Sequence, residues 1–180
     1  LWEMENEIRP LIPMVYYHVW DNYPPPDFNK KYYESNDFIA CISKLTLDVV
    51  KTVAPEVKSS YIPHAVNTNI FTKIDKEAAE SFKEQSFKHL YDPEKFIFFW
   101  NNRNARRKQS GSLIFWFKEF LDKVGHDKAC LVMHTDIKDP HGQDLKAIIE
   151  KLGLTDGQVM FSQEKIEANR LALMYNMADC

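Results

Sequence analysis

A loop with four cations offers the clearest chemistry in this sequence. The segment Asn101–Lys108 reads Asn-Asn-Arg-Asn-Ala-Arg-Arg-Lys, so three arginines and a lysine fall within six positions. The planar fork of arginine suits phosphate oxygens, and lysine adds a point charge. A helical pattern follows the loop, so the positive end of a helix dipole lies beside these cations. This combination predicts a diphosphate site, with a solvated basic turn as the alternative.

Apolar strands and amphipathic helices alternate around this loop. The expected strands cover Phe96–Trp100, Ala129–Met133 and Val159–Phe161. The helix after the loop has an apolar stripe, in which Trp116, Phe117 and Phe120 are expected to be core; the whole stripe contains Leu113, Trp116, Phe117, Phe120, Leu121 and Val124. Strands that alternate with helices indicate parallel pairing with right-handed crossovers. Ligands of such open sheets bind beyond the carboxyl ends of the strands, where the basic loop lies.

The segment before Pro63 has a similar but shorter series of elements. Met14–Val19 and Asp37–Ser43 are apolar runs, which suit parallel strands buried on both faces, and Tyr61–Ile62 is a short third strand. Ser43 is expected to cap the helix that follows it. Trp20 and Asp21 follow the first of these strands, at the end where a ligand would bind. A packed aromatic loop is the alternative for these two residues.

Composition excludes several classes of protein. The 23 basic and 26 acidic side chains give a net charge of -3, which argues against a nucleic-acid binder that works by phosphate neutralisation. No apolar run approaches the ~20 residues of a membrane span, so no transmembrane segment is expected. No glycine-rich phosphate loop occurs, so phosphate would have to meet cationic side chains or a bare helix N-terminus.

The three cysteines show neither pairing nor metal-ligand spacing. Cys41 and Cys130 lie inside apolar runs, and Cys180 is the third. Buried free thiols indicate a reducing compartment, so we expect a cytoplasmic protein, with a position peripheral to a membrane left open. The polar residues His134, Asp136 and His141 could be imagined as a metal site, but ordinary loop residues are the more common explanation. No metal and no cofactor are therefore predicted.

Three segments in order resemble the retaining glycosyltransferases of the GT-B fold, glycosyltransferase family 4, also called group 1. The basic loop with its aromatic helix resembles the start of the C-terminal domain of that family. The segment Tyr61–Phe71 resembles its interdomain segment, and Leu171–Asp179 resembles the helix before its donor-sugar loop. Ala65 departs from the family pattern, which usually has Gly there, and Asn67 departs from the usual Asp.

The resemblance implies roles for particular residues. Arg103 and Lys108 match the spacing of the pair that grips the diphosphate of a nucleotide-sugar donor. The loop Ser162, Gln163 and Glu164 would border the nucleotide base. Trp20, Asp21 and His64 would lie on the acceptor side or in the cleft. The implied acceptor is a saccharide or a lipid-linked molecule.

The resemblance also implies an α/β, GT-B-like architecture of two Rossmann-like parallel-sheet units, both incomplete. Residues 1–66 would be the C-terminal part of the acceptor-side domain, residues 67–94 an interdomain linker and helix, and residues 95–180 the N-terminal part of the donor domain. Since the family's donor-sugar loop and catalytic-side His are not found, the chain alone is expected to be inactive. The strand expected after Asp179 is also not found, so an exposed sheet edge would permit self-association.

The implied activity is transfer of a sugar from a nucleotide donor to a hydroxyl group, with retention of configuration. Two alternatives stay open at this point. One is a non-catalytic Rossmann-like module that binds a nucleotide or a protein, and the other is a sugar-nucleotide epimerase of the same fold.

Overall fold

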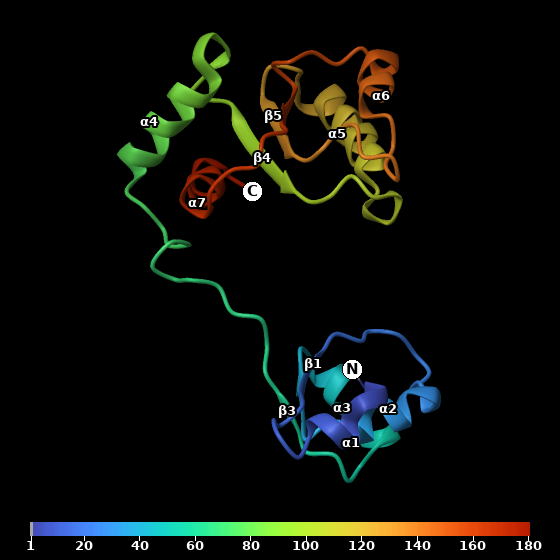
Figure 1. Cartoon of the computed structure of the whole chain (residues 1–180). Coiled ribbons are helices and arrows are strands. Elements are labelled where there is room, and N and C mark those ends of the chain that lie inside the picture. The colour runs from blue at the N-terminus through green and yellow to red at the C-terminus, as the bar shows by residue number, and fades with distance from the viewer. Residues whose placement is uncertain (1) are drawn as a thin grey trace. The chain divides into compact units, whose positions relative to one another are not determined.

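The computed structural model describes residues 2–180, which form two compact units divided between Val66 and Asn67. Each unit contains a three-stranded parallel sheet (Figure 1). Among the described residues, none of the helices combines the length and the apolar character that a membrane crossing requires.

The first unit consists of short elements. Its strands are β1 (Val15–His18), β2 (Phe38–Cys41) and β3 (Ser59–Tyr61), paired in the order β1-β2-β3. Its α-helices are α1 (Glu5–Ile8), α2 (Lys30–Glu34) and α3 (Lys44–Val53), and its 3-10 helices are η1 (Trp2–Met4) and η2 (Asp27–Asn29). Ser43 caps α3 as expected, since its Oγ accepts a hydrogen bond from the backbone N of Thr46 at 3.0 Å.

Only one face of this first sheet is covered by helices within the described residues. The core on that face contains Tyr33, Ile39, Cys41, Val50, Val53 and Ala54. On β1, Tyr16 packs against this core and His18 is buried, whereas Val15 is 64% exposed and Tyr17 is also exposed. The prediction that this strand is buried on both faces is therefore wrong. An all-apolar run shows that a strand can be buried on both faces, but covering layers decide whether it is.

The second unit has longer elements around the strands β4 (Phe96–Asn101), β5 (Ala129–His134) and β6 (Val159–Ser162). Its α-helices are α4 (Lys76–Phe87), α5 (Ser110–Val124), α6 (Leu145–Leu152) and α7 (Ala168–Met177), and its 3-10 helices are η3 (Lys88–Leu90) and η4 (Arg106–Lys108). Gly153 ends α6 in the left-handed region, at φ 65°, as its expected position after the helix predicts.

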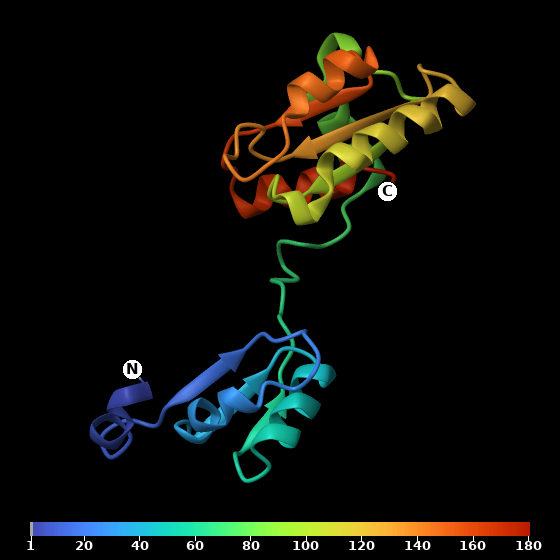
Figure 2. The same cartoon turned by 90° about the vertical axis from the view of Figure 1, so that its right-hand side faces the viewer.

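Helices cover both faces of the second sheet, with α5 and α6 on one face and α4 and α7 on the other (Figure 1). The alternation of side chains along the strands decides which face each residue joins. Phe98, Leu131 and Met133 pack against the α5 and α6 side, while Ile97 and Val132 pack against the α4 and α7 side. The strands of both sheets can be followed in Figure 2.

The aromatic stripe on α5 is only partly core. Phe117 and Leu121 are buried, but Trp116 is 62% exposed, and Phe120 and Val124 are exposed as well. The face that contacts the sheet follows Ile114, Phe117 and Leu121, which recur at the helical period, and Trp116 lies beside it. The prediction that Trp116, Phe117 and Phe120 are core therefore holds for Phe117 and is wrong for Trp116 and Phe120.

The last residues of the chain lie along the outer edge of β4, on the side away from β5. The backbone N atoms of Asp179 and Cys180 donate to the O of Ile97 at 2.9 and 3.2 Å, and the N of Phe99 donates to the O of Cys180 at 2.8 Å. The chain thus proceeds outward from β4 to β6 and then returns, through α7, to the opposite side of β4. The outer edge of β4 is therefore hydrogen-bonded at Ile97 and Phe99. This reversal is the topological switch point of a doubly wound sheet.

Candidate functional site

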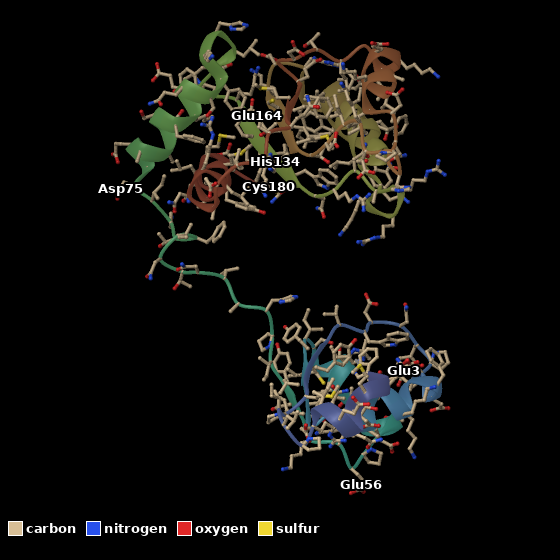
Figure 3. The ribbon with its side chains drawn as sticks, viewed as in Figure 1. Glu3, Glu56, Asp75, His134, Glu164 and Cys180 are labelled. Carbon is tan, nitrogen blue, oxygen red and sulfur yellow. The ribbon has the colours of Figure 1, made fainter. Side chains whose placement is uncertain are left out.

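A row of polar residues ends the three strands of the second unit. Each strand continues one residue beyond its expected end, to Asn101, His134 and Ser162, and these three are in register with one another. Nδ1 of His134 lies 2.9 Å from Oγ of Ser162. Nδ2 of Asn101 donates to the hydroxyl of Tyr175 on α7 at 3.1 Å. The carboxyl edge of the sheet is therefore polar, and Figure 3 labels His134 within it.

The basic loop leaves this edge at β4, next to the switch point. Arg103 lies in the irregular part of the loop, and Lys108 ends the short helix η4. Arg106 and Arg107 are exposed, and Lys108 is half-buried. Within residues 2–180, none of these last three cations has a carboxylate partner within 4.0 Å. The loop therefore concentrates unneutralised positive charge where ligands of this class of sheet bind.

Arg103 forms a two-point ion pair with Asp139, in the loop after β5. Nε donates to Oδ2 at 2.5 Å and Nη2 donates to Oδ1 at 3.1 Å. The Arg103 side chain is 63% exposed, whereas that of Asp139 is only 7% exposed. The hydrogen bonds from Arg103, together with one from the backbone N of His141, lower the pKa of Asp139 to about 2. The carboxylate therefore stays ionised at neutral pH and the pair persists.

A buried amide clamp holds the basic loop to the loop that follows β5. Asn104 is fully buried; its Nδ2 donates to the O of Gln143 at 2.9 Å, and its Oδ1 accepts from Oγ of Ser110 at 2.5 Å. The backbones approach so closely here that a Cβ atom on Gly142 would collide with the carbonyl oxygen of Asn104. Gly142 therefore permits the contact, and the clamp fixes where the cations emerge.

A side chain caps one backbone amide in the first turn of α5. The backbone N of Gly111 donates to Oε1 of Gln143 at 2.8 Å, so a side chain already caps this amide. Gln109, just before the helix, has a left-handed backbone with φ 56°. One amide of this turn is therefore already engaged, whereas the side chains of Arg106 and Arg107 are exposed.

The candidate base loop borders a hollow of about 450 Å³ at the β6 edge of the sheet. Gln163 and Glu164 are exposed, and Ser162 is half-buried against His134. The hollow also receives Arg170 and Met174 from α7, together with Phe82, Gln85, Ser86, Phe87 and Lys88 from α4 and the residue after it. The structure thus gives this loop a cavity with both apolar and polar walls.

The expected acceptor-side residues follow strands of the first unit. Trp20 is half-buried; its Nε1 donates to the O of Asn22 at 3.0 Å, and its ring packs against Phe28 with centroids 6.3 Å apart. Asp21 is exposed. His64 is exposed as well, with Nδ1 3.3 Å from the hydroxyl of Tyr17. Trp20 thus has the surroundings of a packed aromatic loop, which was the alternative to a role on the acceptor side.

His18, the last residue of β1, is a candidate that the sequence did not single out. It is almost fully buried, and its Nε2 lies 2.8 Å from the hydroxyl of Tyr33. Within residues 2–180 its Nδ1 has no hydrogen-bond partner, although the atom is buried. Buried polar atoms are nearly always paired, so a buried ring nitrogen without a partner at the carboxyl end of a strand marks a place where a ligand group could bind.

Acidification should loosen the first unit through His18. Burial lowers the pKa of this imidazole below its ordinary value of 6.5. The folded state therefore favours the neutral ring, so the stabilisation is complete above pH 6.5 and is lost as the pH falls below it. We expect the protection factors of the β2 amides, in which the pH dependence of unprotected exchange is divided out, to fall as the pH drops below 6.5 in the wild type and to fall less in His18→Gln. His64→Gln removes an exposed imidazole instead and should show the same fall as the wild type; equal protection factors for wild type and His18→Gln at every pH would contradict this assignment.

Two of the three residues that could be imagined as a metal site make side-chain contacts with other groups. Nδ1 of His134 lies 2.9 Å from Oγ of Ser162, and Oδ1 of Asp136 accepts from the backbone N of Lys138 at 2.8 Å, whereas His141 contributes its backbone N to Asp139. In the part of the chain that the structure describes, no three His, Cys, Asp or Glu side chains are grouped to hold a metal ion. The His-Asp-His alternative is therefore not supported.

Sequence reasoning missed Asp139, Asn104, Gln143 and Tyr175 as parts of this site. All four lie far along the chain from at least one of their partners, such as 36 residues between Arg103 and Asp139. A usable signal was the clustering of polar residues just after each expected strand, because the carboxyl ends of parallel strands meet at one edge.

No protein-family model matches the sequence, and no curated protein matches it. Solved structures with a similar fold do exist. They include a UDP-forming α,α-trehalose-phosphate synthase from Burkholderia xenovorans, with 14% identity and a TM-score of 0.62 over 96% of this chain and 47% of that one. The corresponding enzyme from Burkholderia vietnamiensis has 13% identity and a TM-score of 0.69 over 98% of this chain and 46% of that one.

A third such enzyme, from Burkholderia multivorans, has 14% identity and a TM-score of 0.69 over 99% of this chain and 48% of that one. The chain thus spans about half the length of these structures. At this level of identity the likeness establishes the fold alone. The expected α/β fold of two parallel-sheet units, matching the halves of GT-B glycosyltransferases, is confirmed.

Proposed function

We infer that the protein is, or is part of, a glycosyltransferase that holds the diphosphate of a nucleotide-sugar donor at the loop between β4 and α5. The single observation that carries this inference is the position of the basic loop at the switch point, with an accessible guanidinium edge on Arg103 and three further cations. Doubly wound sheets bind ligands at this point. The GT-B fold supports the same conclusion, because the structural neighbours include enzymes named as UDP-forming.

In this proposal the cations act electrostatically. As the bond from the sugar to the diphosphate breaks, negative charge builds up on the leaving phosphate. Arg103 can donate two parallel hydrogen bonds to phosphate oxygens, and Lys108 can add a positive charge from the end of η4. Donors that are already in place where charge develops stabilise the transition state more than the ground state. The loop is held in place by the Asn104 clamp, which supplies this preorganisation.

The proposal also assigns places to the nucleotide base and to the acceptor. The hollow beside Ser162, Gln163 and Glu164 is the proposed base-binding region, since it adjoins the same edge of the sheet. The proposed acceptor is a saccharide, a sugar phosphate as in the named activity of the neighbours, or a lipid-linked molecule. Retention of configuration and membership of family 4 follow from the sequence resemblance and stay predictions.

Binding of UDP by the chain tests the diphosphate site. In titration calorimetry, Arg103→Ala and Lys108→Ala should each weaken binding about tenfold to a hundredfold, because each removes a charge-assisted contact. Lys123→Ala is the matched control, since Lys123 is an exposed cation in the last turn of α5, at the end of that helix away from the basic loop. If the wild type and the three variants bind UDP with the same affinity, the basic loop is a solvated turn and not a diphosphate site.

A further inference from the structure

The guanidinium of Arg103 is held along only one of its two hydrogen-bonding edges. Asp139 pairs with Nε and Nη2 and has no competitor for them within residues 2–180. A guanidinium carries five N–H groups, so the edge formed by Nη1 and the second hydrogen of Nη2 remains available. This edge is accessible, because most of the Arg103 side chain is exposed. A phosphate can therefore approach Arg103 without displacing Asp139.

Asp139 is anchored by its own loop and not by Arg103 alone. Its Oδ1 accepts from the backbone N of His141 at 2.9 Å, and its backbone O accepts from the N of Gly142 at 2.9 Å. Its side chain is almost completely covered. The loop continues directly into Gln143, which is part of the buried clamp. Asp139 is thus a fixed point, to which a long and otherwise exposed side chain is tied.

We propose that Asp139 is a positioning residue, which holds the Arg103 guanidinium so that its free edge receives the diphosphate. The proposal rests on the function proposed above and extends it to a residue outside the basic loop. An unpaired arginine would lose its rotamer freedom when it bound phosphate, and the ion pair removes that freedom beforehand. The Asp139 carboxylate also repels phosphate. Its removal should therefore weaken phosphate binding if orientation of Arg103 dominates, and should strengthen it if charge repulsion dominates.

Titration calorimetry with UDP and with inorganic pyrophosphate separates these two effects. At about 0.15 M salt, where exposed charges are screened over about 8 Å, Asp139→Ala should bind both probes about two- to tenfold more weakly. Asp139→Asn retains one acceptor and should fall between Asp139→Ala and the wild type, and Asp139→Glu should restore part of the affinity. In an Arg103→Ala background, Asp139→Ala should cause no further loss, because there is no guanidinium left to orient.

Asp136→Ala is the matched control, because Asp136 is an exposed carboxylate of the same loop that contacts a backbone N and no cation. Thermal melts establish that each variant is folded at the titration temperature. Two results would overturn the proposal. Tighter binding of the probes by Asp139→Ala would mean that the carboxylate competes with phosphate. If Asp139→Ala weakened binding by the same factor in the Arg103→Ala background as in the wild type, Asp139 would merely support the loop. An Arg103→Ala protein that binds both probes like the wild type would instead overturn the diphosphate site itself.

Discussion

Replacing Asn104 by alanine should destabilise the second unit by about 3 kcal/mol, because it removes three side-chain hydrogen bonds from a fully buried clamp. The backbone O and N of Gln143 would lose their side-chain partner, and the hydroxyl of Ser110 would keep only the longer contact with Oε1 of Gln143, at 3.4 Å. Alanine also leaves a small void beside Gly142, whose backbone packs directly on this residue. Chemical denaturation followed by circular dichroism measures the change.

Asn102→Ala is the matched control for this variant, since Asn102 is an asparagine of the same loop for which the structure shows no side-chain hydrogen bond. Its effect should stay within about 0.5 kcal/mol. The Asn104→Ala variant should also bind UDP more weakly under conditions where it is still folded, because the loop that presents Arg103 is no longer held. A stability loss similar to that of Asn102→Ala would show that the clamp contributes little.

Truncating Leu121 to alanine should cost the second unit about 2–5 kcal/mol, the range found for buried large-to-small changes. Leu121 is fully buried on α5 and belongs to the cluster with Ile114, Phe117, Leu131 and Met133, which joins the helix to the sheet. The lost methyl groups and the cavity both contribute, since close-packed interiors relax only partly. The loss of stability can be measured as the change in the free energy of unfolding and as faster hydrogen exchange of the β5 amides.

Val124→Ala is the control for Leu121→Ala, because Val124 lies one helical repeat further along α5 yet is exposed. It should change stability by less than about 0.5 kcal/mol. The comparison also tests the burial pattern of α5 directly. If Val124→Ala proved as costly as Leu121→Ala, the broader apolar stripe expected from the sequence would be the correct core face.

Local patterns were enough to predict most elements of the second unit. Apolar runs located β4, β5 and β6, and Gly153 marked the end of α6, just as Ser43 marked the start of α3 in the first unit. These signals succeed because they depend on neighbours within a few residues. The same reasoning ended each of the three strands one residue early, since Asn101, His134 and Ser162 are polar residues that still pair in register.

Burial was harder to predict than secondary structure. Trp116 and Val15 are apolar and occur in apolar runs, yet both are largely exposed. The hydrophobic pattern states which residues could be covered, whereas the position of the other layers decides which ones are. On α5 the buried face is centred on Ile114, Phe117 and Leu121, and the aromatic side chains beside it extend past the edge of the contact.

The sequence by itself determined the alternation of strands and helices, the parallel sheets that follow from it, and the basic loop after β4. Only the tertiary structure decided that Arg103 is tied to Asp139, that Asn104 is clamped by Gln143, and that the chain returns to the free side of β4. The physical reason is the range of each interaction. Periodicity and capping are local, but an ion pair between two loops exists only because parallel strands bring their carboxyl ends to one edge of the sheet.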